Sequence, residues 1–121
     1  KLGEYLGQLD TEIVEIRPLT YSKNRLVDYI LMTYSEKFKA EGFEFSASAI
    51  VAEELPLTDR EVCSLITNML SNALEACKNS KNENGGGFVR YKMTMSKSKI
   101  QIKCENSCNK KKNVKTMIVF V

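Results

Sequence analysis

Histidine is absent from the 121-residue sequence, and so is tryptophan. Without an imidazole the chain has no histidine general base, no Ser-His nucleophile and no histidine-ligated zinc, and it cannot form phosphohistidine on itself. No apolar run approaches the ~20 residues that a membrane-spanning helix needs, and no signal peptide is visible. We therefore expect a soluble chain whose chemistry does not depend on histidine.

Charge and length restrict the possibilities further. Eighteen basic residues stand against fifteen acidic ones, for a net charge of +3, which is too mild to indicate a nucleic-acid partner. A chain of 121 residues with 43% hydrophobic content can fill one core but not two. The composition predicts one folded domain.

The four cysteines are Cys63, Cys77, Cys104 and Cys108. Cys77 and Cys104 lie inside apolar helix or strand patterns, which favours buried free thiols in a reducing cytosol over disulfides. Cys104 and Cys108 are the only close pair, and a single pair with this spacing is a weak signal for zinc. We expect neither a disulfide framework nor a metal centre.

A strong helical pattern runs from residue 22 to residue 41. Gly42 follows it, at the place where a left-handed C-terminal residue belongs, and Asp28 is expected among the charged residues that face water. Phe43 and Phe45 then alternate with polar residues, as on a half-buried strand. The apolar residues that recur every four positions in the helix are Leu26, Ile30, Tyr34 and Phe38.

A capping box, Thr58 followed by Glu61, opens a second helix that continues past Cys77. Alternating apolar residues in 89–95 and 100–104, around a turn near Lys97-Ser98, predict a β-hairpin, and the closing TMIVFV predicts a last strand. Helices grouped before most strands favour an α+β fold, a two-layer α/β sandwich with the helices on one face of a mixed sheet.

The second helix carries a polar stripe on an otherwise apolar pattern. Asn68, Asn72 and Glu75 fall at positions i, i+4 and i+7, on one side of the helix. Asparagine costs about 0.5 kcal/mol relative to alanine inside a helix. Its amide oxygen is a neutral, hard ligand of the kind that Mg²⁺ accepts beside phosphate oxygens. The stripe indicates either a site facing a cleft or a solvated helix face.

The segment TNMLSNALEA, residues 67–76, resembles the N box of the GHKL ATP-binding fold, which gyrase-type ATPases share with sensor histidine kinases. Its ending, NALEA, is most similar to the peptide-sensing kinases of the accessory-gene-regulator type. Residues 24–43 resemble the first helix and strand of that subfamily, and residues 102–107 extend the resemblance through the hairpin. The similarity covers nearly the whole chain.

The resemblance implies ATP and Mg²⁺ as cofactors and assigns roles to four residues. Asn72 matches the asparagine that holds the Mg²⁺ bridging the nucleotide phosphates. Asn68 matches the catalytic position facing the phosphates, where gyrase-type members carry a glutamate base. Asn106 falls where the family reads adenine with an aspartate, and its carbonyl oxygen can still accept from the adenine amino group. Ser107 follows it in the first glycine box and is carried over as a nucleotide contact.

The chain also departs from the family. Ser107 and Cys108 stand where the first glycine box continues with glycines, and no glycine follows Gly87, so the second glycine motif is missing. The backbone amides of that motif would hold the phosphates at a helix start. The closing TMIVFV resembles the family's last strand and leaves no room for an ATP lid, whose place would be between about residues 110 and 115. We expect weakened nucleotide binding, or none.

The family's organisation would make residues 1–17 the end of an upstream helix or linker and residues 18–121 the ATP-binding catalytic domain. Such a domain donates the γ-phosphoryl group to a histidine on a separate dimerisation domain of a homodimer, which then serves a response regulator. The isolated chain would not be competent alone. It would be the cytoplasmic domain of a membrane-bound bacterial kinase, attached to the membrane only through segments upstream.

Two other classes of function remain open. The same fold can act as a non-catalytic interaction or regulatory module that has lost nucleotide binding along with its glycine motifs. A small nucleic-acid-binding α+β domain is disfavoured, because the sequence shows no exposed aromatic platform on which bases could stack.

Overall fold

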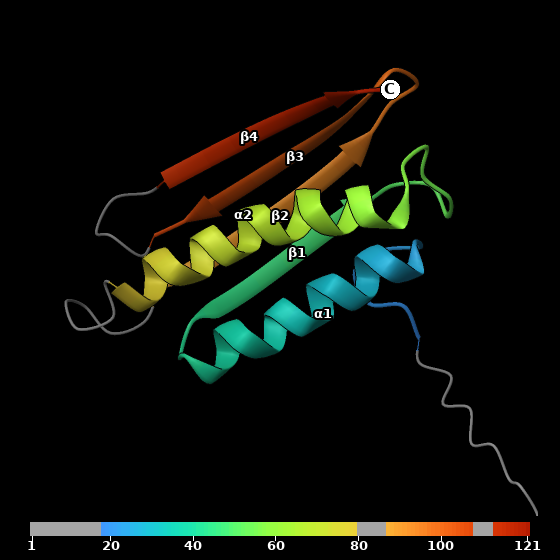
Figure 1. Cartoon of the computed structure of the whole chain (residues 1–121). Helices are drawn as coiled ribbons and strands as arrows, with labels where there is room; N and C mark the ends of the chain where they lie inside the picture. Colours follow the sequence, from blue (N-terminus) through green and yellow to red (C-terminus); the bar gives the residue numbers. More distant parts are fainter. Residues whose placement is uncertain (1–17, 80–86, 108–112) are drawn as a thin grey trace, which may run out of the picture.

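The computed structural model describes residues 18–79, 87–107 and 113–121 (Figure 1). The predicted upstream segment 1–17 and the basic stretch 110–112 lie outside the described residues. The elements follow one another in the order α1 (Arg25–Ala40), β1 (Glu44–Ile50), α2 (Asp59–Asn79), β2 (Phe88–Met95), β3 (Lys99–Asn106) and β4 (Asn113–Phe120).

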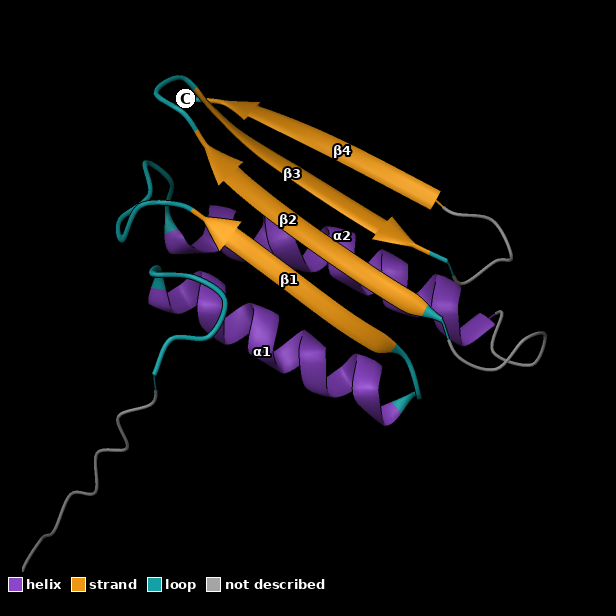
Figure 2. Cartoon of the chain, turned by 180° about the vertical axis from the view of Figure 1, so that it is seen from behind, coloured by secondary structure: helices purple, strands orange, loops and turns teal. Residues whose placement is uncertain are grey.

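The four strands form one mixed sheet in the order β1-β2-β3-β4. β1 and β2 are parallel, whereas the β2–β3 and β3–β4 pairs are antiparallel. Parallel neighbours cannot be joined by a tight turn, so the chain crosses between them through α2. Both helices lie on the same face of the sheet (Figures 1 and 2). The predicted two-layer α+β sandwich and its hairpin are confirmed.

The core fills the space between the two helices and this face of the sheet. Phe38 of α1 stacks on Phe45 of β1 with ring centroids 5.3 Å apart, which joins the first helix to the edge of the sheet. In the described part of the chain no helix covers the other face, and none is long and apolar enough to cross a membrane. The largest fully buried side chains are those of Tyr91, Phe38, Leu31, Ile66, Leu70, Met93, Ile100 and Ile102.

Two predicted helix-end signals are confirmed in atomic detail. The Thr58 amide donates to Glu61 Oε1 over 2.9 Å, and the Glu61 amide donates to Thr58 Oγ1 over 3.1 Å, which completes the capping box that opens α2. α1 ends in a Schellman motif, in which Gly42 adopts φ +86° and the Phe43 amide donates to the Phe38 carbonyl over 3.0 Å.

The expectation that Asp28 faces water is wrong. Its side chain is only 4% exposed, and Oδ1 accepts hydrogen bonds from the backbone amides of Thr20, Tyr21 and Ser22 over 3.1, 2.6 and 3.2 Å. The same short segment continues to the sheet, because the Ala49 amide donates to the Tyr21 carbonyl over 3.1 Å. Asp28 therefore holds the chain before α1 in place beside the sheet edge.

Two further sequence expectations are corrected. Cys77 is fully buried but disulfide-bonded, whereas Cys63 and Cys104 are free thiols. β4 begins at Asn113, not at the start of TMIVFV, so residues 113–115 belong to the sheet. They pair with residues 104–106 of β3, which extends the strand over a stretch expected to be a polar turn and the place of the missing lid.

Replacing Asp28 by alanine is expected to destabilise the fold by about 3 kcal/mol, because the substitution leaves three partly buried amide donors without their acceptor. Asp28→Asn keeps an acceptor oxygen and should cost clearly less. Glu36→Ala, at an exposed position of the same helix, serves as the control and should change stability by under about 0.5 kcal/mol. Urea unfolding followed by circular dichroism measures all three; equal losses for Asp28→Ala and Glu36→Ala would contradict this role.

Candidate functional site

A pocket of about 300 Å³ lies between α2 and the β3–β4 side of the sheet. Three elements supply its walls. α2 contributes one asparagine and three apolar residues, β3 contributes its last residues, and β4 contributes the start of the strand. The lining residues are Met69, Asn72, Ala73, Ala76, Cys104, Asn106, Asn113 and Lys115.

Simple periodicities bring these side chains together. Met69, Ala73 and Ala76 are spaced i, i+4 and i+7 on α2, so they share one helix face, and the two alanines leave space beside the sheet. Across the sheet, Asn106 is the register partner of Asn113, and Cys104 is the partner of Lys115. Opposed residues of antiparallel strands project from the same face, which here is the face that packs against α2.

The pocket combines an apolar floor with polar groups that converge from different elements. Asn106 is 8% exposed, whereas Asn72 and Lys115 lie at exposed positions. A carboxamide both donates and accepts hydrogen bonds, so it can read the edge of a heterocyclic base, and an ammonium group attracts an anion. The volume is at the lower end of the range of ligand sites. The arrangement suits a small planar ligand that carries negative charge at one end.

The pKa of Cys104, the buried thiol at the floor of the pocket, indicates how polar this part of the pocket is. Burial raises the pKa of Cys104 from 9.0 to about 11, and the positive charge of Lys115 opposes that rise. Desolvation disfavours a thiolate more strongly than one nearby ammonium favours it. The surroundings of Cys104 are therefore apolar and disfavour a charged group. The exposed, positively charged Lys115 lines the same pocket.

The sequence predicted four site residues, and the structure brings two of them together. Asn72 and Asn106 line the same pocket from α2 and β3. Asn68 is exposed one turn earlier on α2, and Glu75 is exposed one turn later; neither lines this pocket. The Ser107 hydroxyl accepts from the Phe88 amide over 3.0 Å, and the Ser107 amide donates to the Phe88 carbonyl over 3.1 Å. Ser107 thus links β3 to the start of β2.

Asn113 and Lys115 were not predicted as site residues. They belong to a stretch that sequence reasoning treated as a polar turn before the last strand. A period-2 pattern that runs back from Val119 through Met117 would have placed Lys115 and Asn113 on the inner face of the strand. Because basic and polar residues immediately precede them, this stretch was interpreted as a turn and the alternation was not recognised.

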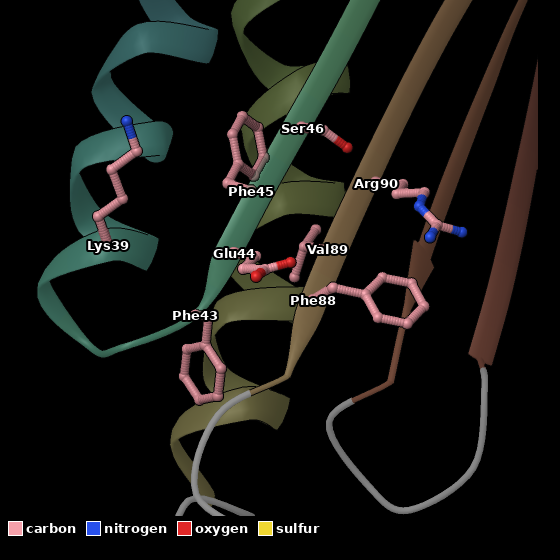
Figure 3. A pocket seen from close by; sticks show the side chains of 8 residues that line it. All are labelled: Lys39, Phe43, Glu44, Phe45, Ser46, Phe88, Val89 and Arg90. Carbon is pink, nitrogen blue, oxygen red and sulfur yellow. The ribbon is translucent and has the colours of Figure 1, made fainter.

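A larger hollow of about 440 Å³ lies where β1 and β2 begin, and it contains none of the predicted site residues (Figure 3). Phe45 lies on the α1 side of β1, whereas Ser46 and Arg90 point the other way. The hollow thus wraps around the edge of the sheet and is not a concave site on one face. Arg90 also packs over the Phe88 ring, 4.3 Å from its centroid, and pairs with Glu105 at 3.8 Å.

Within residues 18–79, 87–107 and 113–121, no group of three Cys, Asp or Glu side chains is placed to hold a metal ion. No protein-family model matches the sequence, and no curated protein matches it either. The geometry of the pocket and the resemblance of residues 67–76 are therefore the basis for assigning a function.

Cys104 is expected to react slowly with iodoacetamide, because at pH 8 a thiol with a pKa of about 11 has roughly a hundredfold less thiolate than one with a pKa of 9.0. Its alkylation rate should keep rising with pH between 9 and 11, where an ordinary thiol levels off. Cys63, a free and only partly buried thiol, is the internal control. Mass spectrometry of peptides gives both rates, and equal rates at pH 8 would contradict the buried floor.

Proposed function

We propose that this chain is the ATP-binding domain of a sensor histidine kinase of the GHKL type, of the accessory-gene-regulator-like subfamily. The observation that supports the proposal most strongly is the pocket that Asn72 and Asn106 share, although they are 34 positions apart in the sequence. The family resemblance assigned Asn72, in the N box, to the metal and Asn106, in residues 102–107, to the adenine of one bound nucleotide. Two side chains with those roles must line a common pocket, and these two do.

In this proposal Asn106 and the apolar floor bind adenine. Met69, Ala73 and Cys104 would contact the faces of the base, and the Asn106 carbonyl would accept a hydrogen bond from its amino group. Asn72 at the outer part of the pocket would contribute one oxygen to a Mg²⁺ whose other ligands are phosphate oxygens and water. Lys115 supplies positive charge for the phosphates from β4.

The lining also fits a phosphoryl donor better than a hydrolase. None of the residues that line the pocket carries a carboxylate, so no lining residue can act as a general base that activates water. Asn68, at the position where gyrase-type relatives have their glutamate base, is a carboxamide one turn from Asn72. A kinase needs the γ-phosphoryl group held for another nucleophile, here a histidine on a separate domain. The chain has no histidine of its own and would therefore supply only the donor.

The second candidate function is a GHKL-fold interaction module that no longer binds nucleotide. It is favoured by the absence of any glycine after Gly87, because the family holds the phosphates with the amides of a glycine-rich segment. Nucleotide binding distinguishes the two candidates. For the first candidate the partners would be a histidine-bearing dimerisation domain and a response regulator, whereas the interaction module would itself serve as a dimerisation or regulatory partner.

Thermal unfolding with MgATP tests the first candidate. A ligand at a hundred times its dissociation constant stabilises the native state by about 2.7 kcal/mol, which raises the melting temperature of a domain of this size by roughly 10 °C. Asn72→Ala should remove the part of the shift that depends on Mg²⁺. Asn106→Ala should remove the preference for ATP over GTP.

Asn79→Ala is the matched control, since it makes the same change at an exposed position of the same helix outside the pocket. It should leave the shift intact. No shift in the unsubstituted chain at millimolar MgATP would refute nucleotide binding and leave the interaction module.

A further inference from the structure

β4 is the last strand of the sheet, and it presents apolar side chains to solvent. Val114, Ile118 and Phe120 project from the face that carries no helix and are 48%, 45% and 78% exposed. We call these three residues the β4 strip. Most edge strands are protected by charges or proline, but between Val114 and Val121 the only charged residue is Lys115, whose side chain lies on the opposite face.

The backbone of β4 offers unused pairing groups along the same residues. The Val121 amide donates inward to the Ser98 carbonyl over 2.9 Å. Because backbone groups alternate along a strand, the amides and carbonyls of residues 114, 116, 118 and 120 point away from β3. In the described part of the chain no strand pairs with that outer edge. The outward backbone groups and the exposed apolar side chains therefore belong to the same set of residues.

We propose that a second copy of this chain pairs with this edge, β4 antiparallel to β4, around a two-fold axis through Met117 and normal to the sheet. Val114 of each copy then lies opposite Phe120 of the other, and Thr116 lies opposite Ile118. The interface closes on itself and joins two four-stranded sheets into one, with all the helices on the same face. This inference is independent of nucleotide binding.

The sequence of the strand is what favours a second copy as the occupant. In this register Val114 and Phe120 of the two copies form two apolar cross-strand pairs on the exposed side, and each Ile118 lies opposite Thr116 and diagonal to the other Ile118. Lys115 lies opposite Val119, so no like charges face each other. Moving the pairing by four residues would place Lys115 opposite Lys115 and leave Phe120 beyond the paired segment. Moving the pairing by only two residues avoids that repulsion but shortens the paired segment. The proposed register therefore combines the longest overlap with no like charges opposite each other.

Sedimentation equilibrium of the chain from 5 to 500 µM tests the proposal. A monomer–dimer equilibrium is expected. Ile118→Lys should weaken it at least tenfold, because it removes the contacts of both Ile118 side chains with Thr116 and brings two lysines to diagonal positions. Ile50→Lys is the matched control, since Ile50 is 68% exposed on the same face but on β1 at the opposite edge of the sheet. Circular dichroism verifies that both variants are folded.

Met117→Cys tests the register. The two copies of residue 117 face each other as a non-hydrogen-bonded pair, about 4.5 Å apart at Cα, a separation that a disulfide can bridge. Mild oxidation should give a covalent dimer with this variant and not with Val119→Cys, whose copies lie opposite Lys115. A monomer at all concentrations, open-ended aggregates, equal weakening by Ile50→Lys, or equal cross-linking of the two cysteine variants would each overturn the proposal.

Discussion

The packing of α2 across β2 and β3 is the contact on which both the core and the candidate site depend. Its buried residues, among them Ile66, Leu70 and Ala73, close the core between the helices and the sheet. The adjacent side of the same helix, with Ala76 and Asn72, forms one wall of the pocket. Since β1 and β2 are parallel, this helix must also cross the sheet to connect them. One element therefore fixes the topology, the core and the position of the site.

Local sequence signals predicted much of the fold, whereas contacts between residues far apart in the sequence were not predicted. The capping box at Thr58, the left-handed Gly42 and the alternation of the hairpin depend on neighbours within a few residues, so the sequence displays them directly. The three bonds to Asp28 come from a segment before α1 whose path no periodicity describes. The disulfide bond of Cys77 was likewise not predicted from its place in an apolar helical pattern. A helical pattern does not indicate whether a charged residue or a cysteine within it binds a partner that is distant in the sequence.

The candidate site was predictable in part, and only through resemblance. Spacing alone showed that Asn72 lies on a polar stripe, but it gave no reason to connect it with Asn106 on a strand end. Their shared pocket agrees with the relation that the resemblance of residues 67–76 and 102–107 implied. Asn68 lies on the same stripe but outside the lining, whose α2 residues begin at Met69 and end at Ala76. Lys115 was missed because the start of β4 looks like a polar turn.

The central claim is that one adenine nucleotide occupies the pocket between α2 and the β3–β4 side of the sheet. The most direct test is to follow the side-chain carboxamide signals of Asn72 and Asn106 by NMR during a titration with ADP, first with Mg²⁺ and then with traces of paramagnetic Mn²⁺. The account predicts that both signals shift with one common dissociation constant and that Mn²⁺ broadens Asn72 more than Asn106. Shifts confined to the helix-free face of the sheet, or unchanged signals at millimolar ADP, would contradict it.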